Sequence, residues 1–337
     1  MALVHLHTLS GLAALEFLPA LLSSALAVKA FFVVSGFLIV MSCERSSSLG
    51  RYASKRFKRI YPAYALVIVL SALALSAVST QSAGAYFSGA LRYVAANLVF
   101  ANFLQPTLPG VFDGNPLQAV NGALWTLKIE VMFYASVPLL VLLIRRFSAF
   151  SVLLAVYVLS SAYLAVTAHL ASTGSQLWLE LNRQLPGQLV YFVSGALFYY
   201  HPQLLQTPKS RWLAAALAVA VLAGRQQAVV ALLEPLAVAT LVMCAAWAAP
   251  QSRLIRLDRF GRYGDFSYGI YIVHFPIIQL LTGSSLRSSP AYFAAAAIVL
   301  IGLAAAASWY GVERRFLVRS RSTADKTPVG VADRHNL

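Results

Sequence analysis

Residues 123–144 read ALWTLKIEVMFYASVPLLVLLI, an apolar run interrupted only by the charged residues Lys128 and Glu130. A helix needs roughly 20 apolar residues to cross the hydrocarbon of a bilayer. Only helices and closed barrels satisfy their backbone hydrogen bonds there, and the alternating ten-residue strands of a barrel are not present in this sequence. The stretch therefore predicts a membrane-spanning helix and, with the runs like it, an all-α polytopic membrane protein.

The composition of the whole chain agrees with a lipid environment. Of its 337 residues, 59% are hydrophobic and 11% are charged, whereas a soluble domain carries roughly 25% charged residues. The mean hydropathy is +0.72. The formal net charge of +15 does not indicate a nucleic-acid binder, because the basic residues fall in short clusters between apolar runs. The expected partners include membrane lipids and no nucleic acid.

Apolar segments recur along the chain, and we expect about ten membrane-spanning helices. The stretch 80–120 is polar and rich in glycine and proline, which predicts a re-entrant or interfacial segment outside the membrane. The expected spans lie at residues 1–22, 26–43, 60–79, 121–145, 151–169, 187–200, 211–223, 226–248, 266–283 and 291–312.

The distribution of basic residues predicts which side of the membrane each loop faces. With ten spans, 20 of the 26 lysines and arginines fall on the side that holds both termini, chiefly in the segments 44–59 and 249–264 and in the tail. The positive-inside rule makes this side cytoplasmic. We expect a transmembrane domain over 1–319 and a disordered cytoplasmic tail over 320–337. No cleavable signal peptide is expected, because the first basic residue is Lys29.

Glu130 is a candidate functional residue because an ionisable group inside the bilayer usually faces a cavity or a partner. Thr126, Glu130 and Tyr134 follow one another at intervals of four and therefore share one helix face. Lys128 points elsewhere, so the face needs a cationic or hydrogen-bonding counterpart on another helix. The alternative is a buried structural network.

His274 is a second candidate, in the run SYGIYIVHFP. Ser267, Tyr271 and His274 lie on one side of the expected helix, and Pro276 should bend it about a turn earlier. Bent helices with a polar face often line cavities in membrane proteins. The alternative is a histidine whose ring is satisfied by a neighbouring hydroxyl.

The remaining charged residues allow simpler interpretations. Acidic and imidazole groups near span ends are expected to snorkel to the interface; these are His169, Glu234 and Glu313. A dense basic patch comprises Lys55, Arg56, Lys58 and Arg59. Membrane topology explains its charge, and a phosphate site is the alternative, because arginine binds phosphate with two parallel hydrogen bonds. Neither of the two cysteines has metal-ligand spacing, and no metal site is predicted.

Several of these residues lie in strings that resemble acyltransferase family 3, whose members O-acylate sugars of bacterial surface polysaccharides and lipopolysaccharide. Each string alone is weak evidence for the family, but six of them follow the family's order and cover nearly the whole chain. They are FFVVSGFLI (31–39), RFKRIYPAY (56–64), ALWTLKIEVMFY (123–134), FVSGALF (192–198), FSYGIYIVHFPI (266–277) and WYGVERRF (309–316).

The resemblance implies a core of ten helices and the transfer of an acyl group to a hydroxyl. The implied donor is acyl-CoA, with acetyl-CoA as the expected form, and the implied acceptor is a glycan or lipid-linked saccharide. The resemblance also implies a catalytic histidine in the first helix, which matches His5, with His7 as the less suitable choice.

Further site residues follow from the family's motifs. The arginine pair of the family falls on Arg56 and Arg59, which would bind the donor, and its acidic motif falls on Trp125–Glu130. Glu130 would act with His5 in catalysis, by orienting the histidine or by binding acceptor hydroxyls. Four residues complete the expected cavity, and they are Ser35, Tyr134, Tyr271 and His274.

Three positions depart from the family pattern. Lys29 stands where an acidic residue is common, Arg314 stands where proline is usual, and no arginine lies about eleven residues before His5. Counted from Met1, His5 would lie about 6 Å along its helix, whereas Glu130 would lie roughly 22 Å from the cytoplasmic face. We therefore expect the native protein to begin upstream, with an arginine near the inner face and His5 level with Glu130.

Two other functional classes fit parts of the pattern. Glu130 and His274 suit the proton relay of a secondary transporter, although the internal repeat that many transporters carry is not found. A membrane binding protein that has lost catalysis would explain the missing arginine.

Overall fold

The computed structural model describes residues 1–224, 228–248 and 264–317. Within these residues the chain is helical and forms no strand. The predicted cytoplasmic segment 249–264 and the predicted disordered tail 320–337 lie outside the described residues, apart from Gly264.

Six helices are long and apolar enough to cross a membrane, and each overlaps an expected span. They are α3 (Ser24–Glu44), α4 (Leu49–Ala74), α6 (Trp125–Arg146), α7 (Ala149–Ala171), α11 (Ala228–Ala248) and α13 (Pro290–Ser308). Three further apolar segments form shorter helices, namely α9 (Leu185–Tyr200), α10 (Pro208–Ala223) and α12 (Ser267–Thr282). Apolar side chains such as Leu159 of α7 and Leu303 of α13 point outward, at 71% and 64% exposure. A soluble protein rarely exposes such faces, and the chain is a helical membrane protein.

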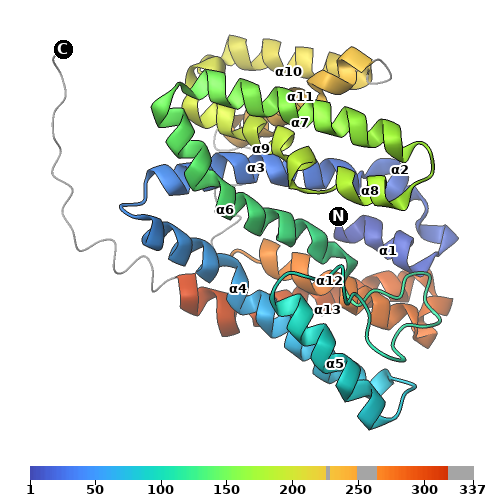
Figure 1. The fold of residues 1–337 in the computed structure, drawn as a ribbon. Coiled ribbons are helices and arrows are strands. Elements are labelled where there is room, and N and C mark those ends of the chain that lie inside the picture. The colour runs from blue at the N-terminus through green and yellow to red at the C-terminus, as the bar shows by residue number, and fades with distance from the viewer. Residues whose placement is uncertain (225–227, 249–263, 318–337) are drawn as a thin grey trace.

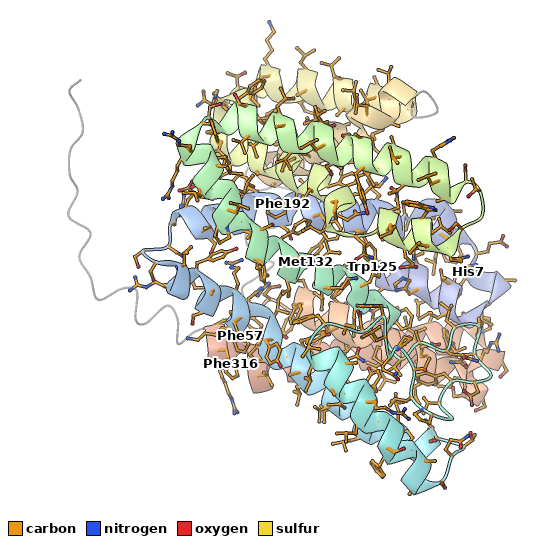
Figure 2. All side chains as sticks on the ribbon, viewed as in Figure 1. His7, Phe57, Trp125, Met132, Phe192 and Phe316 are labelled. Atoms are coloured by element: carbon orange, nitrogen blue, oxygen red, sulfur yellow. The ribbon has the colours of Figure 1, made fainter. Side chains whose placement is uncertain are left out.

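The helices form two groups, each with its own hydrophobic core (Figure 1). One core holds side chains of α1 (Ala2–Ser10), α4, α5 (Ala83–Leu98), α12 and α13. The other core holds side chains of α3, α6, α7, α9 and α11. Helix α6 runs between the groups and contributes side chains to both cores. Leu127 packs in the first core and Phe133 in the second. Phe192 of α9, labelled in Figure 2, stacks on Phe133 with ring centroids 4.3 Å apart.

Helices α3 and α9 cross at a pair of glycines. A Cβ built on Gly36 would lie 1.9 Å from the carbonyl oxygen of Phe192, and one on Gly195 would lie 1.9 Å from that of Val33. Both positions therefore exclude every other residue while the backbones stay this close. The close crossing places Ser35 opposite α6.

Three expected elements differ in the structure. The segment 1–22 is broken into α1 and the short α2 (Phe17–Leu21), because Gly11 adopts φ 66° and ends α1. Helix α4 begins eleven residues before the expected span, since Ser48 caps it by accepting a hydrogen bond from the amide of Arg51. The basic patch thus lies on a helix and not in a loop. Helix α5 occupies part of 80–120, followed by irregular chain.

Candidate active site

His5 and His274 lie against each other where α1 packs on α12. Nδ1 of His5 is 2.8 Å from Nε2 of His274, and the two rings are stacked with centroids 5.1 Å apart. His274 is 1% exposed, whereas His5 is only partly buried. Phe275 places the edge of its ring against His5 at 5.5 Å.

The hydrogen bonds of His274 fix the tautomers of both neutral rings. Nδ1 of His274 faces the backbone carbonyls of Tyr271 at 2.7 Å and Ile270 at 3.1 Å. A carbonyl only accepts, so this Nδ1 carries the proton and Nε2 is an acceptor. His5 must then donate from its own Nδ1, which leaves Nε2 of His5 with a free lone pair. This Nε2 has no hydrogen bond within the described residues, and it is the nitrogen that can take a proton.

Tyr271 connects the histidine pair to α6. Its hydroxyl donates to the carbonyl of Ala123 at 2.5 Å and also meets the hydroxyl of Thr126. Thr126 is 1% exposed and lies one helical turn before Glu130. The connection brings α12 and the start of α6 together at the seam between the two helix groups.

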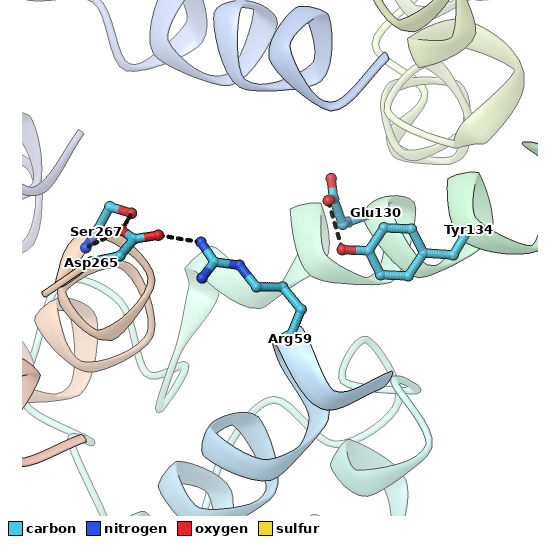
Figure 3. Close-up of polar contacts among 5 residues, drawn as sticks. All are labelled: Arg59, Glu130, Tyr134, Asp265 and Ser267. Carbon is cyan, nitrogen blue, oxygen red and sulfur yellow. Dashed lines mark hydrogen bonds and ion pairs between the residues drawn. The ribbon is translucent and has the colours of Figure 1, made fainter. Parts of the chain in front are cut away.

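Glu130 is 6% exposed, and hydroxyl groups bind both of its carboxylate oxygens. Ser35 of α3 donates to Oε2 at 2.7 Å, and Tyr134 donates to Oε1 at 3.0 Å. Figure 3 shows the carboxylate beside the Tyr134 hydroxyl, on the side of α6 that faces Arg59. The expected counterpart on another helix is thus Ser35, and the residue at Nδ1 of His5 is His274 and not Glu130.

Two prolines free backbone carbonyls that polar side chains then bind. Proline lacks the amide that would bond the carbonyl four residues earlier. Pro138 leaves the carbonyl of Tyr134 free, and the hydroxyl of Tyr52 donates to it at 3.0 Å. Pro276 leaves the carbonyl of Ile272 free, and Asn121 donates to it at 2.8 Å. These bonds fix α4 against α6 and the start of α6 against α12.

Arg56 reaches from α4 to the Glu130 cluster. Its Nη2 donates to the hydroxyl of Ser42 at 2.9 Å, and its guanidinium lies over the ring of Tyr134 at 5.7 Å. Its Nε is buried without a hydrogen-bond partner among the described residues. A buried donor without an acceptor is costly, and this orphaned N–H suits an anionic ligand.

Arg59, one turn further along α4, is held by an acidic residue. Its Nη2 lies 2.6 Å from Oδ2 of Asp265, and the other carboxylate oxygen accepts from Ser267 (Figure 3). Burial raises the pKa of Asp265, but the hydrogen bonds from Ser267 and the charge of Arg59 outweigh it and hold the pKa below its usual value. Asp265 therefore remains ionised at neutral pH and keeps the ion pair.

The structure gathers all eight predicted site residues into two adjoining clusters. One contains Ser35, Glu130, Tyr134 and Arg56, with Arg59 nearby, and the other contains His5, Tyr271 and His274. Sequence reasoning missed Asp265, Asn121 and Tyr52. A proline in a helix leaves the carbonyl four residues earlier free, so Pro138 and Pro276 are signals in the sequence for such carbonyls, but they do not identify the side chains that bind them.

The snorkelling interpretation was wrong for Glu313. This residue lies in the π-helical turn η8 (Trp309–Glu313), is 2% exposed, and accepts from Ser308 at 2.7 Å. Glu234 of α11 pairs with Lys29 of α3 at 2.7 Å, and its side chain is 23% exposed, so its snorkelling stays a prediction. Within the described part of the chain, no group of three or more His, Cys, Asp or Glu side chains could hold a metal ion.

Residues 1–309 match the acyltransferase domain of acyltransferase family 3. The chain belongs to this family and is a membrane O-acyltransferase.

Relatives extend over most of the chain. An O-acetyl transferase of Shigella phage Sf6 is 27% identical over 88% of this chain and 86% of its own length. Nodulation protein 10 of Rhizobium leguminosarum bv. viciae is 28% identical over 77% of this chain and 74% of its own. Acyltransferase MdmB of Streptomyces mycarofaciens is 26% identical over 36% of this chain and 30% of its own. No solved structure matches the chain.

Proposed function

We propose that the protein transfers an acyl group, acetyl in the first instance, from acyl-CoA to a hydroxyl of a glycan or lipid-linked saccharide. The histidine pair is the observation that carries this proposal. Its geometry leaves Nε2 of His5 as a free base, and Tyr271 and Thr126 connect the pair to the helix face that carries Glu130. The relatives named as an O-acetyl transferase and an acyltransferase support the reaction type.

In the proposed reaction, His5 acts as the general base. Its Nε2 takes the proton of the acceptor hydroxyl while the hydroxyl oxygen attacks the carbonyl carbon of the thioester. The carbon–sulfur bond then breaks, and His5 returns the proton to the leaving thiolate. The products are the O-acyl ester and free coenzyme A. His274 positions His5 by accepting its Nδ1 proton in a hydrogen bond, and Glu130 acts beside it by binding acceptor hydroxyls.

The donor is proposed to bind through its phosphates at the basic face of α4. Arg56 offers the orphaned Nε–H, and Arg59 lies one turn away. Lys58 of the same helix and Arg315 line a separate cavity of about 420 Å³, which neither Arg56 nor Arg59 lines. The two arginines are therefore the groups proposed to bind the phosphates of coenzyme A.

The proposed setting is a bacterial inner membrane that the chain crosses ten times, with both termini in the cytoplasm. The family pattern and the distribution of basic residues support this topology. This topology places the first turns of α4, where the donor is proposed to bind, on the cytoplasmic side.

Transfer of labelled acetyl groups tests the proposal. Purified protein would be incubated with acetyl-CoA labelled in the acetyl group and a panel of bacterial glycans, and label in the glycan fraction would be measured. We expect label in at least one glycan, with equal release of free thiol. Thiol release without labelled glycan, or neither signal, would reject the proposal. Proton-coupled uptake in vesicles without acetyl transfer would instead identify a transporter.

A further inference from the structure

A second cavity lies at the opposite end of α6 from Arg145 and Arg146. It has a volume of about 550 Å³ and is formed by the start of α6, the chain after α5, and the short helix α8 (Gln176–Asn182) with the turn that follows it. Seven of its thirteen lining side chains are polar or charged. None of the predicted site residues lines it, so the cavity is separate from the proposed donor site.

The polar groups of this cavity are only partly used by the protein. Asn102 has no hydrogen bond within the described residues, and the indole N–H of Trp125 (Figure 2) has none there either. Lys128 donates one of its three protons, to Oε1 of Gln184 at 2.8 Å, and lies over the ring of Phe103 at 4.8 Å. The cavity thus combines free donors and an amide acceptor with two aromatic surfaces.

The charge in the cavity excludes the donor. Arg183 is paired with Glu180 at 3.3 Å, so Lys128 supplies the net charge of one. Coenzyme A carries several phosphate charges, and the more basic face of α4 suits it better. A lipid tail is also a poor occupant of this polar cavity, because the protein has an apolar cavity elsewhere that suits a tail better. A third cavity, of about 560 Å³, lies between α7, α9 and α11 and is lined almost entirely by apolar side chains such as Leu154 and Leu236.

The cavity adjoins the catalytic residues through two contacts. Gly122 lies at its wall, and a Cβ there would lie 2.8 Å from the ring of Phe275, the same ring that contacts His5. Trp125 precedes Thr126, whose hydroxyl meets Tyr271. Along α6, Lys128 comes two residues before Glu130, a rise of about 3 Å. Lys128 points to a different face of α6 from Glu130, so the cavity meets the catalytic residues at Gly122 and Phe275.

We propose that this cavity binds the acceptor as a saccharide, either neutral or carrying a single negative charge. The inference rests on the proposed function and adds the acceptor's location and its charge. Sugars present hydroxyls for the free amide and indole groups, and their apolar faces stack on aromatic rings such as Trp125. Pockets that orient a ligand in this way combine apolar walls with a few polar groups. Along α6, the proposed acceptor site at Trp125 and Lys128 thus precedes Glu130, whereas Arg56 lies over Tyr134, which follows it.

Binding to a printed array of bacterial surface glycans, including mono- and disaccharide fragments, tests the assignment. We expect the wild-type protein in detergent to bind at least one glycan. Loss of a neutral hydrogen bond in Asn102→Ala should raise Kd about fivefold, and loss of a charged one in Lys128→Gln about tenfold or more. Asn102 has no partner to lose, so this variant keeps the fold. Lys209→Gln, an exposed lysine on α10, is the matched control and should bind as wild type.

Two results would overturn the assignment: a wild-type protein that binds no glycan on the array, or cavity variants that bind as tightly as wild type. Thiol release from acetyl-CoA, measured with the bound glycan present, tests the transferase separately. Glycan binding that depends on Asn102 and Lys128 without thiol release would support the saccharide site and reject the proposed reaction.

Discussion

His274 is the residue whose role the structure changes most. The sequence offered it as a cavity residue, whereas the structure places its Nε2 against Nδ1 of His5 and its Nδ1 against backbone carbonyls. A 1% exposed imidazole with both nitrogens bonded has no room for a ligand of its own. It therefore acts through His5, as the groups that orient catalytic histidines do in other enzymes.

Replacing His274 should distinguish a role in orienting His5 from a role in packing alone. We expect His274→Leu to lower kcat roughly 100-fold with little change in KM for acetyl-CoA, because Nδ1 of His5 loses its acceptor. Glutamine can place its Oε1 near the former Nε2, so His274→Gln should recover a large part of the rate. Steady-state kinetics of both variants test this. Equal losses in the two variants would indicate a structural role only.

Arg56 should matter for the donor more than its neighbours on α4. Its buried, unpartnered Nε distinguishes it from Arg59, which is paired with Asp265. We expect Arg56→Ala to raise KM for acetyl-CoA by a factor corresponding to about 1.5–3 kcal/mol, the value of a charge-assisted hydrogen bond. Arg59→Ala should also raise KM.

Arg51→Ala controls for this change, since Arg51 is exposed on the first turn of the same helix. It should leave KM unchanged. Unaltered donor KM in the Arg56 and Arg59 variants would mean that the basic patch serves topology alone.

At the scale of helices, apolar runs predicted the long elements well. The expected span 26–43 became α3 and 151–169 became α7, each within two residues at either end. The failures have local causes. Hydropathy cannot register the positive φ of Gly11 that divides 1–22, and it reads the basic start of α4 as a loop although Ser48 caps a helix there.

The structure brings the predicted site residues together, but their pairings could not be predicted from the sequence. Periodicity placed Thr126, Glu130 and Tyr134 on one face, and all three contact the site. That Ser35 and not a cation meets Glu130 depends on the crossing of α3 with α9, which lies outside any local pattern. The His5–His274 contact joins residues 269 positions apart, so the spacing of residues in the sequence could not predict it either.

The glycine crossing of α3 and α9 gives a stability prediction. In Gly36→Ala the new Cβ would clash with the backbone carbonyl of Phe192, so the helices must separate. Overpacking of this kind costs about 1–3 kcal/mol or more, and acyl transfer should fall because Ser35 moves from Glu130. Thermal unfolding in detergent measures the loss.

Gly302→Ala in α13 is the matched control, because a Cβ there meets nothing within 4 Å. It should be neutral or slightly stabilising, since alanine favours a helix over glycine. A Gly36→Ala protein as stable as wild type would show that the two helices are not packed this closely.

At the scale of the whole molecule, two helix groups meet along α6, and the proposed catalytic residues lie at that seam. Lys128 in the wall of the polar cavity precedes Glu130 along α6, whereas Arg56 of α4 lies over Tyr134, which follows it. The proposed acceptor and donor sites would therefore lie at different heights along this helix.

The proposed topology makes the first turn of α4 cytoplasmic. A cysteine at position 51 should resist a membrane-impermeant maleimide in intact cells and react after the cells are opened. The basis is the excess of lysine and arginine on this side. Labelling of Arg51→Cys in intact cells would show that the protein has the opposite orientation in the membrane.

The claim that His5 is the catalytic base is tested most directly by acetyl transfer in His5→Ala beside His7→Ala. His7 lies two residues away, and its Nδ1 bonds the carbonyl of Leu12 just after α1 and not His274, which makes it the matched control. We expect His5→Ala to lose acetyl transfer, by roughly 100-fold or more, while keeping its affinity for acetyl-CoA. His7→Ala should retain most of the rate. Full activity in His5→Ala, or equal loss in both variants, would contradict this account of the active site.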